Sequence, residues 1–429
     1  MPQLLIVEAV SAGLLSQPVD SLPPSLLDEG LAMLSSLCQD CLTVSDPCIT
    51  EAGPAPSWPM QAFLPERFAA SNLQVIAMVQ PALVSAFTGF ISRQQAATVA
   101  KRAAYLPRQA QLWTRRWQPA NTVELITAEQ LWSIDHHRTT GHSGAIPDCP
   151  KRLKIVDGPG GNPHQHLRQL ADSVDAIWII APEPEASQLI ATLQPWKQKL
   201  WNLPISVLQF AERKSNYTFY PYLVLDSMAL PSLTLAGGLP DWLTESDALV
   251  LKPDNRCGCE GVYRLDKRSS LSSPREVISA VEQWIADCLP VELRNLESNW
   301  LLGPWVAGET LSVAFCMNED RIMQFPVCRQ ELRWTPTVST ASIDAATAHY
   351  DGCCWAEPDR QASLVLWIKE NLPRLIGNEF QAGWMGLDLI HHPQSNAATP
   401  SEEWTLVDFN ARLTSSYNLL RHLRRPTAA

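Results

Sequence analysis

Short segments that are almost wholly apolar are the feature of this sequence that most restricts its fold. They recur far apart along the chain, each bordered by turn residues or by a segment with helical spacing: Leu4–Val7, Leu73–Val79, Ala176–Ala181 and Ala248–Leu251. A strand without a polar face must be covered on both sides, and helices that alternate with such strands supply that cover. The first part of the chain is therefore predicted to be an α/β domain.

Helical spacing and end signals place three helices in this first part. The predicted segments are Ser25–Leu34, Gln94–Tyr105 and His166–Ser173. Ser25 is the expected N-cap of the first helix, and Pro107 ends the second because a residue before proline avoids helical geometry. Residues 107–163 carry several prolines and a multi-glycine turn, and they are predicted to be irregular or inserted.

The second half of the chain is predicted to be α+β with antiparallel pairs. Ser312–Met317 and Arg321–Phe325 flank a turn and indicate a β-hairpin. Ser273 and Glu276 have the spacing of a capping box and predict a helix over Pro274–Leu289. Further strands are expected at Val262–Leu265, Trp384–Ile390 and Trp404–Leu413, and a helix from about Gln361 that Pro373 ends or kinks. We place the domain boundary so that residues 1–205 form the first domain and 206–425 the second.

Composition narrows the class of protein. The chain has 429 residues, 46% of them hydrophobic and 18% charged, so a large buried core is expected. The net charge of −11 disfavours binding to nucleic-acid phosphates. No apolar run reaches the roughly 18 residues of a membrane span, and eleven cysteines without an even framework are typical of a reducing compartment. A cytoplasmic protein without membrane or nucleic-acid partners is expected; a homodimer is compatible with the sequence.

The segment Trp404–Leu413 concentrates polar chemistry on one side of a strand. Alternation places Val407, Phe409, Ala411 and Leu413 on an apolar face. The opposite face carries a carboxylate, a carboxamide and a guanidinium, which are those of Asp408, Asn410 and Arg412. These side chains are predicted to point together from a rigid element.

Asp388 lies within the apolar strand before it, and a carboxylate there needs a partner. If the two strands pair, Asp388, Asp408 and Asn410 form the all-oxygen set that Mg²⁺ prefers. A solvated strand face with ordinary ion pairs is the alternative, and spacing alone favours it.

Lys252 follows four apolar residues and precedes a loop that contains Gly258 and Gly261. A cation at a strand end beside a glycine loop suits a phosphate group. The loop is neither a Walker A sequence nor a dinucleotide fingerprint. A lysine that leaves the sheet for solvent is the alternative.

Taken in order, these pieces resemble the ATP-grasp superfamily over about residues 206–424. The resemblance rests on Lys214, on Lys252-Pro253 with Gly258 and Gly261, on the linker Trp305–Glu309, on Asp388, and on Asp408-Phe409-Asn410-Ala411-Arg412. It implies an N-terminal Rossmann-like pre-ATP-grasp domain followed by a two-lobed ATP-grasp domain.

The resemblance also implies a function and a set of roles. ATP would bind between the lobes, with Lys214 and Lys252 on its phosphates and Gly258, Gly261, Trp305 and Val306 around the nucleotide. Asp388, Asp408 and Asn410 would hold Mg²⁺, with Mn²⁺ as the alternative ion, and Arg412 and Lys252 would be catalytic. The expected reaction joins a small-molecule carboxylate to an amine through an acyl phosphate.

Three further segments are similar to the tyramine–glutamate ligase-like proteins of methanofuran-type cofactor biosynthesis. They are Pro24–Leu34, Ala181-Pro182-Glu183 and Asn410–Tyr417. The resemblance does not extend over residues 48–163. It favours glutamate as the carboxylate and a tyramine-like amine as the acceptor, in one-carbon cofactor biosynthesis.

The sequence departs from the superfamily pattern in its phosphate loop and in its last strand. The loop carries Arg256, Cys257, Cys259 and Glu260, and Asp408 replaces the usual glutamate. Two other functions therefore stay open. One is a nucleotide-binding regulatory or scaffold protein with weak or no catalysis, and the other is an amino-acid or peptide ligase with different substrates.

Three other groups of residues receive structural interpretations. Cys38 and Cys41 have redox spacing but no preceding strand. The group His136, His137 and His142 lacks a Cys or carboxylate framework and is interpreted as a solvated loop. Cys353-Cys354 is predicted to lie in a turn. A further hypothesis is that this turn lines the substrate cleft.

Overall fold

The structure of the chain is a computed structural model. It describes residues 2–12, 14–15, 24–44, 73–79, 83, 111–114, 124–126, 153–157, 163–183, 185–217, 221–225, 239–256, 259, 261–268, 271–294, 299–318, 321–356, 361–376, 383–392, 403–414 and 416–420. The predicted helix Gln94–Tyr105 and the histidines at 136, 137 and 142 lie outside the described residues.

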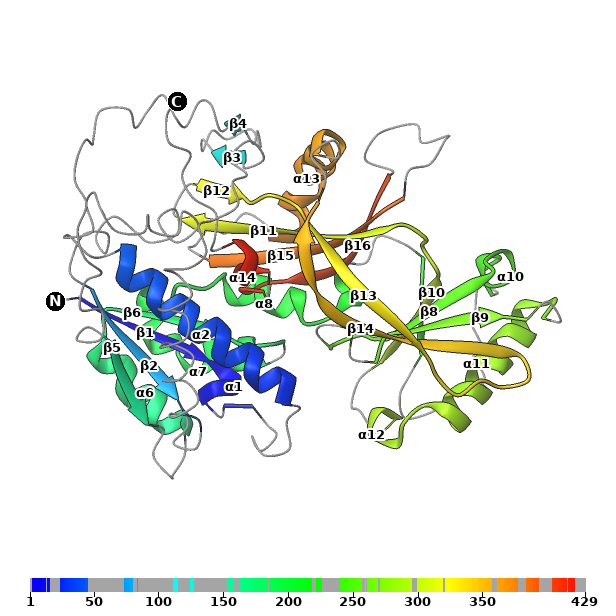
Figure 1. The fold of residues 1–429 in the computed structure, drawn as a ribbon, viewed down its shortest axis with the longest axis horizontal. Helices are drawn as coiled ribbons and strands as arrows, with labels where there is room; N and C mark the ends of the chain where they lie inside the picture. The colour runs from blue at the N-terminus through cyan, green and yellow to red at the C-terminus, as the bar shows by residue number, and fades with distance from the viewer. Residues whose placement is uncertain are drawn as a thin grey trace.

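The first sheet has four parallel strands (Figure 1). They are β1 (Gln3–Glu8), β2 (Gln74–Val79), β5 (Leu153–Asp157) and β6 (Ala176–Ile180), in the order β5-β2-β1-β6. Three of them coincide with the apolar segments of the sequence. Their residues are buried almost throughout, as expected for parallel strands with both faces covered.

Helices cover both faces of this sheet. Helix α2 (Pro24–Val44) packs on the face that carries Leu4 and Ile6. The opposite face, with Leu5 and Val7, packs against α6 (Pro163–Ser173) and α7 (Glu185–Thr192). Alternation along β1 therefore assigns each leucine to a different layer. The helix α2 is longer than the segment predicted from the sequence.

A buried glutamate closes the carboxyl end of β1. Glu8 is 3% exposed. Its carboxylate accepts hydrogen bonds from Val10 N, Ser11 N and Ser11 Oγ at 2.7–3.0 Å, and so caps α1 (Ala9–Ala12). Gly30 of α2 lies directly against this carboxylate, because a Cβ at Gly30 would lie 2.5 Å from Glu8 Oε2.

The second sheet has twelve strands among the described residues, and every pair in it is antiparallel. Its strands are β3 (Gln111–Thr114), β4 (Glu124–Ile126), β7 (Leu223–Leu225), β8 (Ala248–Pro253), β9 (Tyr263–Lys267), β10 (Trp300–Pro304), β11 (Glu309–Asn318), β12 (Arg321–Gln324), β13 (Cys328–Pro336), β14 (Ile343–Trp355), β15 (Gly383–His391) and β16 (Trp404–Asn410). The predicted hairpin is present as β11–β12.

Three short strands lie within residues 107–163, where the sequence predicts an irregular or inserted segment. The backbone of β3 pairs with β12 at the edge of the second sheet, β4 pairs with β3, and β5 belongs to the first sheet. The segment is therefore not irregular throughout. Strands of three to five residues are too short to produce a periodic signal in the sequence.

The remaining helices lie in the second half of the chain. They are α8 (Ile205–Ala211), α9 (Lys214–Tyr217), α10 (Trp242–Glu245), α11 (Pro274–Cys288), α12 (Val291–Arg294), α13 (Gln361–Ile376) and α14 (Tyr417–Leu420). The capping box of α11 is formed, since Ser273 Oγ accepts from Glu276 N and Glu276 Oε2 accepts from Ser273 N. Among the described residues, no helix is long and apolar enough to cross a membrane.

Helix α13 does not end at Pro373. It continues to Ile376, with Leu372, Leu375 and Ile376 no more than 3% exposed. Proline removes one hydrogen bond near the end of this helix, and the burial of the apolar residues around it offsets that loss.

Three apolar clusters hold the layers together. One is formed by β7–β10, α10 and α11, which we call lobe A, together with Ile343 and Ala345 of β14. The other two join the first sheet and its helices to β11, β15, β16 and α13, which we call lobe B. The boundary at residues 205/206 stays a prediction. The apolar core nevertheless runs continuously across it, because Val7 and Ile179 share a cluster with Val313 and Phe315.

Gly30→Ala is expected to lower the midpoint of urea unfolding. Alanine favours a helix by about 1 kcal/mol over glycine, but the new Cβ would lie 2.5 Å from a carboxylate oxygen that three hydrogen bonds hold in place. Ala32→Gly in the same helix is the matched control, and it should show only the loss of helix propensity. A higher midpoint for Gly30→Ala would contradict the close contact with Glu8.

Candidate functional site

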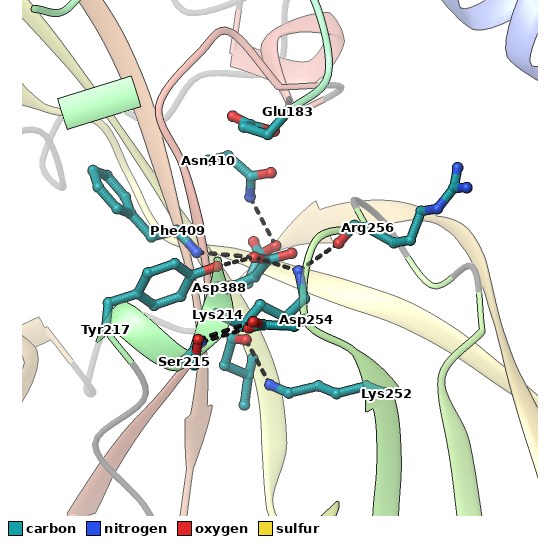
Figure 2. Close-up of polar contacts among 12 residues, drawn as sticks. Glu183, Lys214, Ser215, Tyr217, Lys252, Asp254, Arg256, Asp388, Phe409 and Asn410 are labelled. Carbon is teal, nitrogen blue, oxygen red and sulfur yellow. Dashed lines mark hydrogen bonds and ion pairs between the residues drawn. The ribbon is translucent and has the colours of Figure 1, made fainter. Parts of the chain in front are cut away.

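The predicted acidic residues meet across β15 and β16 (Figure 2). Asp388 is opposite Asp408 in the strand register, and Gly386 is opposite Asn410; Figure 2 shows Asn410 and Asp388 joined by a hydrogen bond. The amide nitrogen Nδ2 of Asn410 donates to Asp388 Oδ2 at 3.2 Å. The structure therefore brings together the three residues predicted to bind metal.

A bulge interrupts β16 beside this cluster. The register shifts between Asp388 and Leu389, so that Leu406 rather than Val407 is opposite Leu389. Val407 was predicted to share the apolar face with Phe409 and Ala411, and it does not: it is half-buried while those two lie in the core. One extra residue in a strand turns its side chain out of the alternation and leaves its carbonyl available to other donors.

Lys252 Nζ uses that carbonyl and donates to Val407 O at 3.0 Å. Lys252 lies on β8 and is 5% exposed. Burial, and next the neighbouring charge of Lys214, lower the pKa of Lys252 to about 7, against the attraction of Asp408 and Asp254. The side chain does not leave the sheet for solvent, which was the alternative considered from the sequence.

Lys214 forms a buried ion pair with Asp408. The distance from Lys214 Nζ to Asp408 Oδ1 is 3.0 Å, and the two side chains are 7% and 14% exposed. Lys214 Nζ also donates to the carbonyl of Arg256. Asp408 Oδ1 accepts two further hydrogen bonds, from Tyr217 OH at 2.7 Å and from Phe409 N at 3.0 Å.

The two carboxylates have opposite electrostatic environments. Burial raises the pKa of Asp408, but Lys214, Tyr217 and Lys252 outweigh it and hold that pKa below its usual range. Burial and then the charge of Asp408 raise the pKa of Asp388 to about 6. One carboxylate is thus neutralised by a lysine, and the other is repelled by its neighbour.

This donor set fits a divalent cation by its chemistry. Two half-buried carboxylates and an amide supply oxygen ligands, and a bound cation would remove the repulsion between Asp388 and Asp408. Among the described residues no group of three His, Cys, Asp or Glu is placed to hold a metal ion. The third protein donor would be Asn410 Oδ1, which accepts from Arg412 Nη2 at 3.3 Å.

Asp254 fixes the position of Lys214 and was not singled out from the sequence. It is 2% exposed and follows Lys252-Pro253. Its carboxylate accepts from Ser215 N at 2.7 Å and from Ser215 Oγ at 2.9 Å, while its carbonyl accepts from Lys214 N. The signal in the sequence is an acidic residue directly after a strand that ends in Lys-Pro.

Tyr217 was also missed. It is three residues after Lys214 in α9, which places the two side chains on the same side of a helical turn. Burial, and then Asp408, raise the pKa of Tyr217 well above its usual value, so the phenol stays protonated and donates to that carboxylate.

Arg412 joins the site to the first half of the chain. It lies beyond β16, which ends at Asn410, three residues before the end predicted for this strand. Its Nε donates to Glu183 Oε2 at 3.2 Å, and its other nitrogens donate to Leu413 O and Asn410 Oδ1. Glu183 follows β6 of the first sheet, so this contact brings together residues 229 positions apart.

The structure describes only part of the predicted phosphate loop. Gly258 lies outside the described residues. Gly261 has φ of +74°, a conformation that favours glycine, and a Cβ there would lie 3.2 Å from Pro253 Cδ. Cys259 is half-buried; burial, and then Asp388 and Asp408, raise the pKa of its thiol to about 12. Cys259 therefore lies close enough to Asp388 and Asp408 for their charges to act on its thiol.

The linker residues Trp305 and Val306 follow β10. Trp305 N donates to Ala248 O of β8 at 3.0 Å. The indole ring of Trp305 packs edge-on against Trp334, with 5.0 Å between ring centroids, and the guanidinium of Arg264 lies 4.9 Å from it. Val306 is half-buried. Trp305 thus belongs to an aromatic and cationic surface formed by β8, β9 and β13.

The predicted cysteine features differ in their surroundings. Cys38 and Cys41 are buried in α2, and burial raises the pKa of both thiols, which makes them poor nucleophiles. Cys353 is half-buried; a hydrogen bond with Cys328 lowers its pKa to about 7, although Asp388 raises it. Cys353 therefore lies close enough to Asp388 for their charges to interact.

No known family model and no curated protein sequence matches the chain. Among solved structures, the chain is similar to a protein from Archaeoglobus fulgidus described as belonging to the ATP-grasp superfamily, with 13% identity over 99% of this chain and 89% of that one, at a TM-score of 0.46. It is also similar to L-amino acid ligase from Bacillus licheniformis, with 11% identity, 97% and 70% coverage and a TM-score of 0.41.

D-alanine–D-alanine ligase from Bacillus anthracis is a third similar structure, with 14% identity over 61% of this chain and 77% of that one, at a TM-score of 0.38. All three TM-scores lie below 0.5. A function for this chain therefore has to be argued from its own side chains.

Asp254→Ala is expected to lower the free energy of unfolding by about 1–3 kcal/mol, because it leaves two donors of Ser215 without their acceptor. Asp254→Asn keeps one acceptor oxygen and should lose less. Urea unfolding followed by tryptophan fluorescence measures both. Equal midpoints for the alanine variant and the parent would contradict the organising role of Asp254.

Proposed function

We propose that the protein is an ATP- and Mg²⁺-dependent carboxylate–amine ligase of the ATP-grasp type. The observation that carries this proposal is the meeting of two buried lysines, Lys214 and Lys252, with the paired carboxylates Asp388 and Asp408. Cations suit a polyphosphate, and oxygen ligands suit the metal ion that accompanies it. The order of these residues along the chain, which resembles the superfamily pattern, supports the same function.

Each residue has a role in this proposal. The ammonium groups of Lys214 and Lys252 bind phosphate oxygens, and the backbone near Gly258 and Gly261 approaches the phosphates. Asp388, Asp408 and Asn410 would hold Mg²⁺, with Mn²⁺ as the alternative ion. When bound, the metal supplies neutralisation of the charge on the phosphate oxygens.

The nucleotide base would lie near Trp305 and Val306, between lobe A and lobe B. Arg412 neutralises charge on the transferring phosphoryl group and on the acyl phosphate. Asp254 and Tyr217 keep Lys214 and Asp408 in position during the reaction.

The proposed reaction has two steps. A carboxylate oxygen of the first substrate attacks the γ-phosphorus of ATP, and ADP leaves with the electrons of the broken bond. The nitrogen of the second substrate, as the neutral amine, then attacks the acyl carbon; the bond to phosphate breaks, one proton of the nitrogen leaves with the phosphate, and an amide remains. These steps need positioning and charge neutralisation more than proton transfer by the protein.

The favoured substrates are glutamate and a tyramine-like aryl-amine, in one-carbon cofactor biosynthesis. This choice rests on the resemblance of Pro24–Leu34, Ala181–Glu183 and Asn410–Tyr417 to the tyramine–glutamate ligase-like proteins. An amino-acid or peptide ligase with other substrates uses the same residues, because specificity depends on loops outside this cluster.

A nucleotide-binding scaffold protein without catalysis is the second candidate, and one observation favours it. The charged groups already satisfy each other: Lys214 is paired with Asp408, and Lys252 donates to Val407 O. The bulky residues of the phosphate loop, Arg256 among them, also favour a protein without catalysis. In that case ATP would raise the melting temperature without any release of ADP.

The deciding experiment measures ADP released from ATP and Mg²⁺ with glutamate and a panel of amines that includes tyramine. Amine-dependent ADP release together with an amide product, identified by mass spectrometry, is the expected result. A shift of the melting temperature by ATP, with no ADP from any pair of substrates, would exclude the ligase and favour the scaffold.

Lys252→Ala is expected to lower ADP release by about 100-fold, the cost of removing one fixed charge-stabilising group from a transition state. Lys369→Ala, at an exposed position of α13, is the control and should leave the rate unchanged. Circular dichroism checks that both variants are folded. Unchanged turnover in Lys252→Ala would remove this lysine from the phosphate site.

Asp408→Asn is expected to raise the Mg²⁺ concentration for half-maximal ADP release by about 10-fold or more. Replacing a residue that only hydrogen-bonds to a metal ligand already lowers metal affinity by about 10-fold, and Asp408 is proposed to be a ligand itself. Binding of Mn²⁺, followed by the electron paramagnetic resonance of the free ion, provides a readout independent of turnover. Titrations that superimpose on those of the parent would contradict the metal assignment.

A further inference from the structure

Glu183 is a buried carboxylate with one oxygen that the rest of the described structure does not satisfy. The residue is 8% exposed. Its Oε2 accepts from Arg412 Nε, but Oε1 is buried without a hydrogen-bond partner among the described residues. An unpaired buried carboxylate oxygen is costly, so a group that donates a hydrogen bond to it, and above all a cation, would bind there favourably.

The position of Glu183 relates it to the reacting groups. It lies just after β6, at the carboxyl end of a parallel strand, and contacts the second half of the chain through Arg412. Arg412 in turn donates to Asn410, which donates to Asp388. Figure 2 shows Glu183 beyond Asn410, on the side of the cluster opposite Lys252. The site thus has lysines at one end and a carboxylate at the other.

The charge at this end selects the kind of ligand. A phosphate or a substrate carboxylate would be repelled by Glu183, whereas the lysine end attracts both. Glu185 is half-buried nearby; burial raises its pKa, a backbone hydrogen bond and the charge of Arg256 act against that rise, and the charge of Glu183 adds least. The guanidiniums of Arg412 and Arg256 offset these two acidic groups, so the preference for an ammonium group rests on the unpaired Oε1 of Glu183.

A metal ion is the weaker interpretation of this oxygen. Magnesium needs several oxygen donors in an octahedral arrangement, and the second oxygen of Glu183 is already bound to a guanidinium. The described residues also hold no group of three His, Cys, Asp or Glu suited to a metal. A single free carboxylate oxygen matches one N–H donor far better.

We propose that Glu183 binds the ammonium group of the amine substrate through Oε1 and holds its nitrogen beside the group that Arg412 stabilises; the ammonium passes one proton to this carboxylate oxygen before its nitrogen attacks. This inference rests on the proposed ligase function for the meaning of the site, but binding of the amine can be tested without turnover. Glu183 is then a substrate-binding residue that determines which of the two substrates lies at the first-sheet side of the site.

The binding test uses two pairs of probes that differ only in the charged group: tyramine with tyrosol, its alcohol analogue, and n-butylamine with n-butanol. Isothermal titration calorimetry on the full chain with ATP present is expected to show at least about 10-fold tighter binding of each amine, the value of one charge-assisted hydrogen bond. In Glu183→Gln this preference should disappear. Glu370→Gln, at an exposed position of α13, should retain it.

Loss of the preference in Glu183→Gln supports the proposal. Equal binding of amine and alcohol by the parent, no binding of either amine, or an unchanged preference in Glu183→Gln would each overturn it. An amine preference in a protein that releases no ADP would leave this inference standing and remove the ligase function instead.

A kinetic test separates amine binding from an effect through Arg412. Hydroxylamine is mainly uncharged at neutral pH and traps an acyl phosphate as a hydroxamate. Glu183→Gln is expected to keep hydroxamate formation from glutamate within about two-fold of the parent, while the KM for tyramine rises about 10-fold or more. An equal fall in both reactions would show that Glu183 only positions Arg412, and would overturn the proposal.

Discussion

The buried ion pair between Lys214 and Asp408 is the interaction on which the arrangement of the site depends. Removing either partner would leave a charge in a nearly dry environment, at a cost of about 3–5 kcal/mol in comparable buried pairs. The pair joins α9 to β16 across 194 residues of sequence. Asp254 orients α9 from the end of β8, and Tyr217 donates to the same carboxylate oxygen. Three segments are therefore held in one arrangement because two opposite charges each need the other.

The polar cluster is supported by an apolar core that crosses from the first sheet into the second. Phe409 of β16 and Ala411, just after it, pack in the same cluster as Leu5 and Val7 of β1, while Asp408 and Asn410, the residues beside them in sequence, belong to the site. Alternation along one strand thus anchors the polar side chains to both halves of the molecule. The contact between Arg412 and Glu183 completes this connection on the polar side.

The sequence predicts what depends on periodicity and on local end signals. The strands β1, β2, β6, β8, β15 and β16 follow from apolar runs, and the capping box of α11 follows from Ser273 and Glu276. Asp388 and Asp408 could be placed together because two adjacent strands of this kind tend to pair. The bulge at Val407 could not be predicted, since it depends on the pairing partner rather than on β16 itself. The contact of Glu183 with Arg412 could not be predicted either. Glu183 follows a strand of the first sheet and Arg412 follows a strand of the second, and no local pattern in the sequence relates the two.

The long hairpin of β13 and β14 connects lobe A with lobe B (Figure 1), since β13 pairs with β11 and β14 pairs with β9. Its register slips between Glu331 and Leu332, and Gly352, which is opposite Glu331, has φ of +142°. A ribbon of two hydrogen-bonded strands resists stretching far more than twisting, and a bulge with a glycine opposite it is where twist is most easily absorbed. The hairpin therefore fixes the distance between the two lobes, and the irregular register lets the angle between them change.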